Sequence, residues 1–531
     1  MKGNKFHQIS KWVKDHLETL ERKHPFTPWH TSMIILLGVS FVLRIYNLSG
    51  ESLWLDEIYS LERAKLSLTQ IYEVSYRPLY FFFLHFWLRI FGTSELALRI
   101  PGVIFGVLSV FVLYKIGKLL FDERIGLLSA LILALSQFHV WQSQEVRMYS
   151  MLAFFSALSM FYFLIMVKKE WSRLRAAGYL ISSVLLFYTH PFGIFIIVAQ
   201  NTFLFTFVMS KESKIKPSIK KWVMLQTVLF ASFIPLLAGY LGKARSIQSG
   251  EGLGWISEPT VITIIRVFIR YSGHVLLFIL FVLAFVLCIY RWSRERMDVN
   301  GSRYTSEEET RSSWWGGSRG WVGSLNKNKE GYLLTLWIAI PNIIPFFLSL
   351  VWKPIYGPAK YTITASLGFY LLAAFCILKL DKKKIKGVFV ISIIILSALS
   401  MGIYYTTPVK EQWEDTANYI DDNAREGDLV IFSAGFTELC FNYYSERDDL
   451  EKRSFPYETR PRRPRTLSKN IEINQTHIEE LESITEGYDR VWVVMSHARG
   501  DSGSISVKMD EGYNNTLHEE YVKIDVYLWE K

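Results

Sequence analysis

Apolar residues occur in long blocks through most of the chain, and short polar segments separate the blocks. About 20 consecutive apolar residues cross the hydrocarbon core of a bilayer as a helix, and most blocks have about that length. The pattern therefore predicts a mainly α, polytopic membrane protein with about eleven transmembrane helices. We expect them at residues 31–48, 101–120, 125–141, 148–167, 176–190, 191–210, 222–241, 272–290, 332–351, 359–380 and 387–404.

The pattern changes after residue 404, where apolar positions become short runs between polar residues. Residues 413–424 have the spacing of an amphipathic helix. Residues 428–432 and 491–495 are typical of buried strands, and residues 521–529 alternate as a third strand does. Residues 405–531 are therefore expected to form a small α/β domain.

The polar segment after the first block, about residues 49–100, contains one further apolar stretch at 78–91. It is about fourteen residues long, which is too short for a full span. We expect this stretch to be an interfacial or re-entrant helix on the outer surface, within a long first outer loop.

Composition supports a membrane protein and excludes several classes. Half of the 531 residues are hydrophobic, only 20% are charged and the mean hydropathy is positive. These values exclude an ordinary cytosolic enzyme and a disordered chain. The three cysteines, Cys288, Cys376 and Cys440, provide neither a disulfide framework nor a Cys-rich metal site.

The net charge of +10 does not indicate nucleic-acid binding, because the cations lie in short clusters after alternate apolar blocks. Cytoplasmic loops of membrane proteins carry this excess. We therefore expect a plasma-membrane protein with a cytoplasmic segment 1–30 and a transmembrane domain 31–404. A cytoplasmic loop is expected at about 291–331, and 405–531 should be extracytoplasmic.

The sharpest candidate site is a pair of adjacent carboxylates, Asp56 and Glu57, which follows the first apolar block and lies beside Trp54. A carboxylate near lipid is costly unless it is paired or used in function. A solvated pair of loop acids is the simpler alternative.

Other polar residues are predicted on the same outer side, near the ends of several spans. Each of these residues, taken alone, has an ordinary explanation, such as an interfacial anchor, a helix break or a snorkelling lysine. Together they indicate an anionic ligand and a carboxylate that carries out proton chemistry. The candidates for substrate binding are Tyr76, Arg77, Glu145, Arg147, Tyr149, His190, Lys353, Tyr356, Lys360 and Tyr361.

Taken in their order along the chain, the short segments that contain these polar residues resemble the motifs of integral-membrane glycosyltransferases with the GT-C fold. The similar branch is that of the protein mannosyltransferases (glycosyltransferase family 39), with the lipid A aminoarabinose transferases among its relatives. The resemblance covers about residues 31–445. The matching segments are Trp54–Glu57, Arg77–Tyr80, Phe91–Pro101, Ser143–Tyr149, Tyr188–His190, Lys360–Tyr361, Trp413–Glu414 and Gly427–Ile431.

The resemblance implies a hexosyl- or pentosyltransferase that uses a polyprenyl-phosphate sugar, of dolichyl or undecaprenyl type. The sugar would move to an acceptor hydroxyl on the extracytoplasmic face, with inversion at the anomeric carbon. By motif match Asp56 would be the general base, with Glu57 as a second catalytic carboxylate. Arg77 would contact the lipid phosphate, and Lys360 stands where many relatives have arginine.

Several alternatives stay open at this point. Glu57 and His190 could hold a divalent cation (Mg, Mn or Zn) or orient the base, although their spacing is not a metal signature. The acceptor could be a protein, a glycan or a lipid. A transporter or flippase of lipid-linked saccharides is the main rival, and a non-catalytic assembly or receptor component is the third reading. The absence of an internal repeat and of charges at mid-span favours the enzyme.

Overall fold

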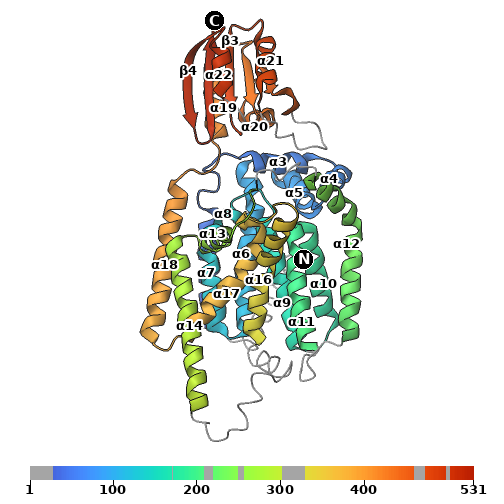
Figure 1. The fold of residues 1–531 in the computed structure, drawn as a ribbon, viewed down its shortest axis with the longest axis vertical. Helices are drawn as coiled ribbons and strands as arrows, with labels where there is room; N and C mark the ends of the chain where they lie inside the picture. The colour runs from blue at the N-terminus through green and yellow to red at the C-terminus, as the bar shows by residue number, and fades with distance from the viewer. Residues whose placement is uncertain are drawn as a thin grey trace, which may run out of the picture.

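The structure is a computed structural model that describes residues 28–169, 171–208, 219–248, 256–301, 329–459, 473–497 and 503–531. A bundle of long helices forms one part of the molecule, and a small sheet domain lies at one end of the bundle (Figure 1). Most of the predicted cytoplasmic segment 1–30 and of the predicted loop 291–331 lies outside the described residues.

All eleven predicted apolar segments are helical in the structure. The bundle consists of α2 (Pro28–Ile45), α6 (Glu95–Leu120), α7 (Glu123–Ala134), α8 (Gln137–Ser143), α9 (Tyr149–Lys168), α10 (Arg173–Thr189), α11 (Ile194–Val208), α12 (Ile219–Gln248), α14 (Val275–Gly301), α16 (Lys329–Val351), α17 (Ile363–Lys379) and α18 (Lys383–Thr406). Eight of the described helices are long and apolar enough to cross a membrane, or nine if the bent pair α7–α8 is one span. The protein is therefore a multi-pass membrane protein, although α10, with 17 residues, is at the lower limit of a span and α11, with 15 residues, is below it.

Three shorter helices, α3 (Leu55–Lys65), α4 (Leu68–Val74) and α5 (Pro78–Phe91), lie between the bundle and the sheet domain (Figure 1). α5 has the bounds that the apolar stretch predicts. Pro78 starts α5 with a preset φ, and Gly92 ends it with a φ of +80°. The amphipathic helix α13 (Val261–Ser272) was not predicted.

The predicted span at 125–141 is broken, since α7 and α8 meet at a bend of 62°. The buried Arg44 guanidinium donates to the carbonyls of Leu133 (3.3 Å) and Ala134 (3.2 Å), which end α7. It also donates to Ser143 Oγ (3.2 Å) at the end of α8. Carbonyls freed at a helix break need donors where water is scarce. Arg44 therefore stabilises a bend that directs the chain into the loop 144–148.

Within its described residues, the C-terminal domain contains five strands and four α-helices. Its helices are α19 (Trp413–Asn423), α20 (Glu438–Tyr444), α21 (Gln475–Thr485) and α22 (Gly503–Met509). Its strands are β1 (Leu429–Ser433), β2 (Glu451–Phe455), β3 (Arg490–Met495), β4 (Asn514–Tyr521) and β5 (Ile524–Glu530).

The sheet order is β2-β1-β3-β5-β4. The strands β2, β1 and β3 are parallel to one another, and β5 runs antiparallel to both of its neighbours, β3 and β4. β1, β3 and β5 correspond to the three predicted strands. The two strands that the sequence did not predict are the polar edge strands, where charged residues are usual.

Candidate active site

Charged side chains from three segments meet on the side of the bundle that faces the sheet domain. Asp56 lies in the first turn of α3, Arg147 in the loop between α8 and α9, and Lys360 in the short helix η2 (Ala359–Thr362). Asp56 Oδ2 is 3.3 Å from Lys360 Nζ and 3.7 Å from Arg147 Nη2. The Asp56 side chain is still 36% exposed. The structure thus holds one carboxylate between two cations and leaves it accessible.

These cations determine the charge of Asp56. Burial opposes ionisation, but the charges of Arg147 and Lys360 outweigh it and hold the pKa of Asp56 well below its usual range. Arg147 is fixed by bonds to the Asp56 carbonyl (2.9 Å) and to Ser60 Oγ (3.3 Å). Asp56 is therefore a charged carboxylate at neutral pH.

Aromatic rings form the walls of this cluster. Lys360 Nζ lies 5.4 Å from the Trp54 ring centroid and 5.5 Å from that of Tyr149. The Tyr149 ring is 5.9 Å from His190 and 6.1 Å from Tyr361, and these last two rings are 5.7 Å apart. The structure therefore brings together residues that are more than 300 positions apart in the sequence.

Several buried polar atoms around the cluster have no hydrogen-bond partner among the described residues. They include Trp54 Nε1, Arg77 Nε, Glu145 Oε2, Arg147 Nε and Tyr149 Oη. Burial raises the pKa of Glu145, and the nearby Lys360 and Lys410 offset only part of this effect. An unsatisfied buried polar group costs about 1–3 kcal/mol, so several together are typical of a site that a polar ligand completes.

A further cation, Arg63, belongs to the cluster and was not predicted. Burial and the charges of Arg77 and Arg147 lower the pKa of Arg63 to about 10. Several cations in one cluster favour the binding of an anionic ligand. Asp56, Ser60 and Arg63 are at positions i, i+4 and i+7, which places them on one face of α3. That spacing is the signal that could have found Arg63.

The neighbouring Glu57 has a different environment and is completely buried. Arg99 donates to both of its oxygens, at 3.1 and 2.9 Å. Val146 N donates at 2.9 Å and Lys410 Nζ at 3.1 Å. Burial opposes ionisation, but the charges of Arg99 and Lys410 lower the pKa of Glu57 to about 2. Glu57 thus joins α3, α6, the loop 144–148 and the segment after α18.

Two predicted binding residues, Tyr356 and Lys353, form no hydrogen bond or ion pair with Asp56, Arg147 or Lys360. Tyr356 is buried, and its hydroxyl donates to Asn342 Oδ1 of α16 at 3.1 Å. Lys353 forms no hydrogen bond or ion pair with any residue that the structure describes. The side chain of Arg77 lies 5.2 Å over the ring of the predicted Tyr76, at the start of α5.

No group of three candidate metal ligands in the described ranges includes Glu57 or His190. The one such group there is His518, Glu520 and Asp525 on β4 and β5. The Nδ1 atom of His190 accepts a hydrogen bond from Phe192 N at 3.2 Å. Its imidazole therefore caps the short helix η1 (Pro191–Gly193).

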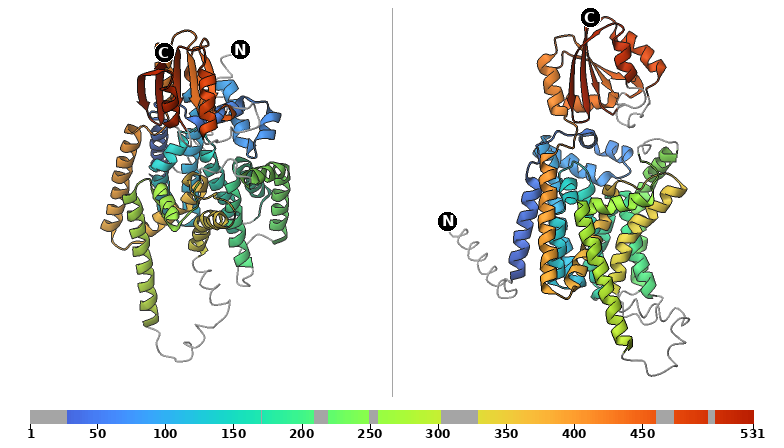
Figure 2. Two further views of the ribbon diagram at one scale, coloured as in Figure 1. Left: turned by 45° about the horizontal axis from the view of Figure 1, so that its top comes forward. Right: turned by 60° about the vertical axis from the view of Figure 1, so that its left-hand side comes forward.

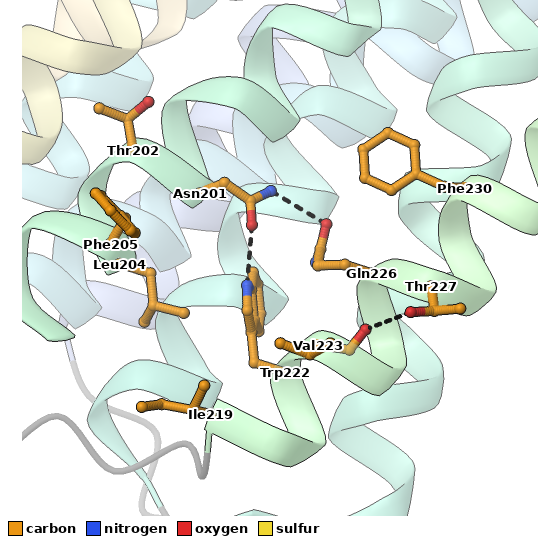
Figure 3. Close-up of a pocket in the computed structure, with 10 residues that line it drawn as sticks. All are labelled: Asn201, Thr202, Leu204, Phe205, Ile219, Trp222, Val223, Gln226, Thr227 and Phe230. Carbon is orange, nitrogen blue, oxygen red and sulfur yellow. Dashed lines mark hydrogen bonds between the residues drawn. The ribbon is translucent and has the colours of Figure 1, made fainter.

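A recess of about 760 Å³ lies elsewhere, between α11 and α12 (Figure 3). Its wall is mostly carbon. The Asn201 amide accepts from Trp222 Nε1 (2.9 Å) and donates to Gln226 Oε1 (3.1 Å), so these polar groups are satisfied by one another. This recess therefore lacks the charges and free polar atoms of the Asp56 cluster.

Comparisons with known proteins agree with this architecture. Residues 75–238 match the family of dolichyl-phosphate-mannose-protein mannosyltransferases. No curated protein sequence matches the chain. The crystal structure of ArnT from Cupriavidus metallidurans bound to undecaprenyl phosphate superposes with a TM-score of 0.57 at 10% identity, over 93% of this chain and 97% of ArnT.

A second similar fold is that of the Archaeoglobus fulgidus oligosaccharyltransferase in its apo form. The TM-score is 0.51 at 13% identity, over 94% of this chain and 75% of the oligosaccharyltransferase. The predicted architecture, a multi-pass helical domain with a small α/β domain, is confirmed. The chain has the GT-C fold of membrane glycosyltransferases, and its residues 75–238 carry the sequence pattern of the protein mannosyltransferase family.

Proposed function

We propose that this protein is a membrane glycosyltransferase that moves a sugar from a polyprenyl-phosphate donor to an acceptor hydroxyl. The observation that carries the proposal is the accessible Asp56 carboxylate between Lys360 and Arg147, surrounded by buried polar atoms without partners. The match to the mannosyltransferase family supports it. So does the similar fold of ArnT, whose structure holds undecaprenyl phosphate.

In the proposed reaction, the acceptor oxygen attacks the anomeric carbon of the sugar. Asp56 takes the hydroxyl proton as the new bond forms, because a positioned carboxylate can act as a general base. The bond from the anomeric carbon to the phosphate oxygen breaks, and the polyprenyl phosphate leaves as an anion. A single displacement of this kind inverts the anomeric configuration.

The leaving phosphate needs positive charge and hydrogen-bond donors. Arg63, Arg77 and Arg147 supply guanidinium groups, and the Nε atoms of Arg77 and Arg147 have no partner within the described chain. Lys360 adds a point charge, which cannot form the two-pronged bond of an arginine. We therefore expect the phosphate to lie between these cations, with the sugar directed towards Asp56 and the wall of Trp54 and Tyr149.

We assign Glu57 a positioning role instead of a direct role in the reaction. Both of its oxygens already accept hydrogen bonds from Arg99, Val146 and Lys410. A divalent cation on Glu57 would have to displace at least one of these donors. The proposed reaction therefore runs without a metal ion on this carboxylate.

The proposed orientation places the sheet domain outside the cell and the N-terminus in the cytoplasm. Basic residues gather at the opposite end of the bundle, where Lys168 ends α9, Lys379 ends α17 and Lys383 begins α18 (Figure 1). The positive-inside rule assigns that end to the cytoplasm of the plasma membrane.

The proposal is tested with purified protein in lipid and a panel of polyprenyl-phosphate monosaccharides. The measurement is transfer of labelled sugar to water, to peptides, to glycans or to lipid acceptors. We expect turnover of one donor by the wild type and its loss in Asp56→Asn, which controls for a contaminating enzyme. Saturable binding of lipid-linked sugars without transfer from any donor to any acceptor would contradict the proposal and favour a transporter.

A further inference from the structure

A short linker, residues 407–412, connects α18 to α19 and lies where the sheet domain meets the outer loop (Figure 2). One side of this linker is bonded to the loop that carries Asp56. Glu51 Oε1 accepts from the backbone N–H groups of Val409 (2.6 Å) and Lys410 (3.1 Å). Just beyond the linker, Glu414 N donates to Ser52 Oγ at 3.1 Å.

The other side of the linker is bonded to the sheet domain. His497, which follows β3, has its Nε2 atom 2.7 Å from Glu411 Oε1. The turn between β4 and β5 adds two contacts, from Val522 N to Gln412 Oε1 (2.9 Å) and from Lys523 Nζ to the Val409 carbonyl (2.5 Å). The linker therefore lies between the domain and the loop and is fixed to both.

Glu411 is the linker residue whose side chain reaches the first backbone N–H of α3, the helix that carries Asp56. Its Oε2 atom accepts from Leu55 N (3.3 Å) and from Trp413 Nε1 (2.7 Å), and its side chain is 1% exposed. Leu55 is the first residue of α3, and its N-cap residue Trp54 provides no side-chain cap. The first N–H groups of a helix need an acceptor, and a carboxylate there also matches the helix dipole.

We infer that Glu411 caps α3 from the C-terminal domain side and thereby positions Asp56, the residue directly after Leu55. His497 orients the Glu411 carboxylate, so docking of the sheet domain is part of the assembly of the active site. Burial disfavours the charged form, but hydrogen bonds from His497 and Trp413 keep the pKa of Glu411 below its usual value. This inference rests on the proposed role of Asp56.

The first test compares Glu411→Ala with wild type on a donor that turns over. We expect kcat to fall about 10- to 100-fold, since a displacement of about 1 Å of a catalytic group costs this much. The KM for the donor should stay within about twofold, because the phosphate-binding cations are untouched. Glu411→Gln keeps an oxygen for Leu55 N and should restore activity to within about threefold of wild type.

The matched control is Glu414→Ala. It is the same substitution three residues away, at an exposed side chain whose backbone N–H alone contacts the loop. We expect wild-type kcat for this variant. The inference is overturned if Glu411→Ala keeps its kcat within twofold. It is also overturned if Glu411→Ala loses donor binding and thermal stability together with kcat and Glu411→Gln does not restore them.

Hydrogen exchange separates this inference from the proposed function. The amides of residues 53–58 should exchange about tenfold faster in Glu411→Ala than in wild type or Glu414→Ala, since an uncapped helix start opens more often. This result does not depend on turnover. If the wild type uses no donor, the proposed function fails, but the hydrogen-exchange rates still show whether Glu411 caps α3. Equal exchange in all three proteins would overturn the cap.

Discussion

Asp56 and Glu57 are neighbours in the sequence, but they lie in two different regions of the molecule. Asp56 faces an accessible cluster of cations and aromatic rings, and its side chain is 36% exposed. Glu57 faces the packed junction of α3 with α6, with 0% exposure and donors on both oxygens. Both acids are paired with two cations, so what distinguishes them is exposure: the side chain of Asp56 stays accessible, whereas that of Glu57 is enclosed by donors.

Helix geometry produces this difference. Successive side chains of a helix point about 100° apart, so adjacent acids at the start of α3 face different neighbours. Arg147 and Lys360 reach Asp56 at 3.7 and 3.3 Å and leave one side open. Arg99 and Lys410 enclose Glu57 at 2.9 and 3.1 Å.

The largest expected effect on stability comes from Glu57→Gln. The substitution keeps the size of the side chain but leaves Arg99 and Lys410 buried without their carboxylate. Breaking a buried ion pair in this way costs about 3–5 kcal/mol. We expect a clearly lower unfolding temperature in detergent, measured by intrinsic fluorescence. An unchanged unfolding temperature would show that the pairing around Glu57 does not hold the outer loop.

A smaller effect, on activity alone, is expected for Lys360→Gln. Lys360 is paired with Asp56 and lies over the Trp54 ring, so its loss removes one positive charge from the proposed phosphate site. We expect kcat/KM for the donor to fall about 10- to 100-fold, because such groups stabilise developing charge. Lys360→Arg, which keeps the charge, is the matched control and should retain most of the activity. Equal losses in both variants would point to packing instead of charge.

The smallest effect is a shift in the pH profile. The pKa of Asp56 is depressed, so the base is charged at any pH above that low value. Activity should therefore stay constant as the pH falls through about 4, the ordinary pKa of an aspartate, and decline only at still lower pH. In Lys360→Gln the pKa of Asp56 rises, and the decline should begin at higher pH. If the activity of both proteins declines at the same acidic pH, the result would contradict the pairing of Lys360 with Asp56.

Much of the fold follows from local patterns. The long apolar blocks predict the helices, and the fourteen-residue stretch predicts α5 with its observed bounds. The break between α7 and α8 was not predicted, because it depends on Arg44, about 90 residues earlier in the chain. The edge strands β2 and β4 were missed because their residues are polar.

The candidate site was predicted only in part. Motifs near span ends identified Asp56, Arg147 and Lys360, and the structure brings each of the two cations within 4 Å of the Asp56 carboxylate. The partners of Glu57 were missed because Arg99 and Lys410 come from segments 42 and 353 residues away. No local pattern shows which acid such distant cations will meet.

The most direct test of the central claim is the kcat of Asp56→Asn together with its donor binding. The amide has almost the same shape but cannot take the acceptor proton at neutral pH. We expect kcat to fall at least about 100-fold, while donor binding and unfolding temperature stay close to those of wild type. If Asp56→Asn keeps more than half of the wild-type kcat on the same donor and acceptor, Asp56 is not the base and the account is wrong.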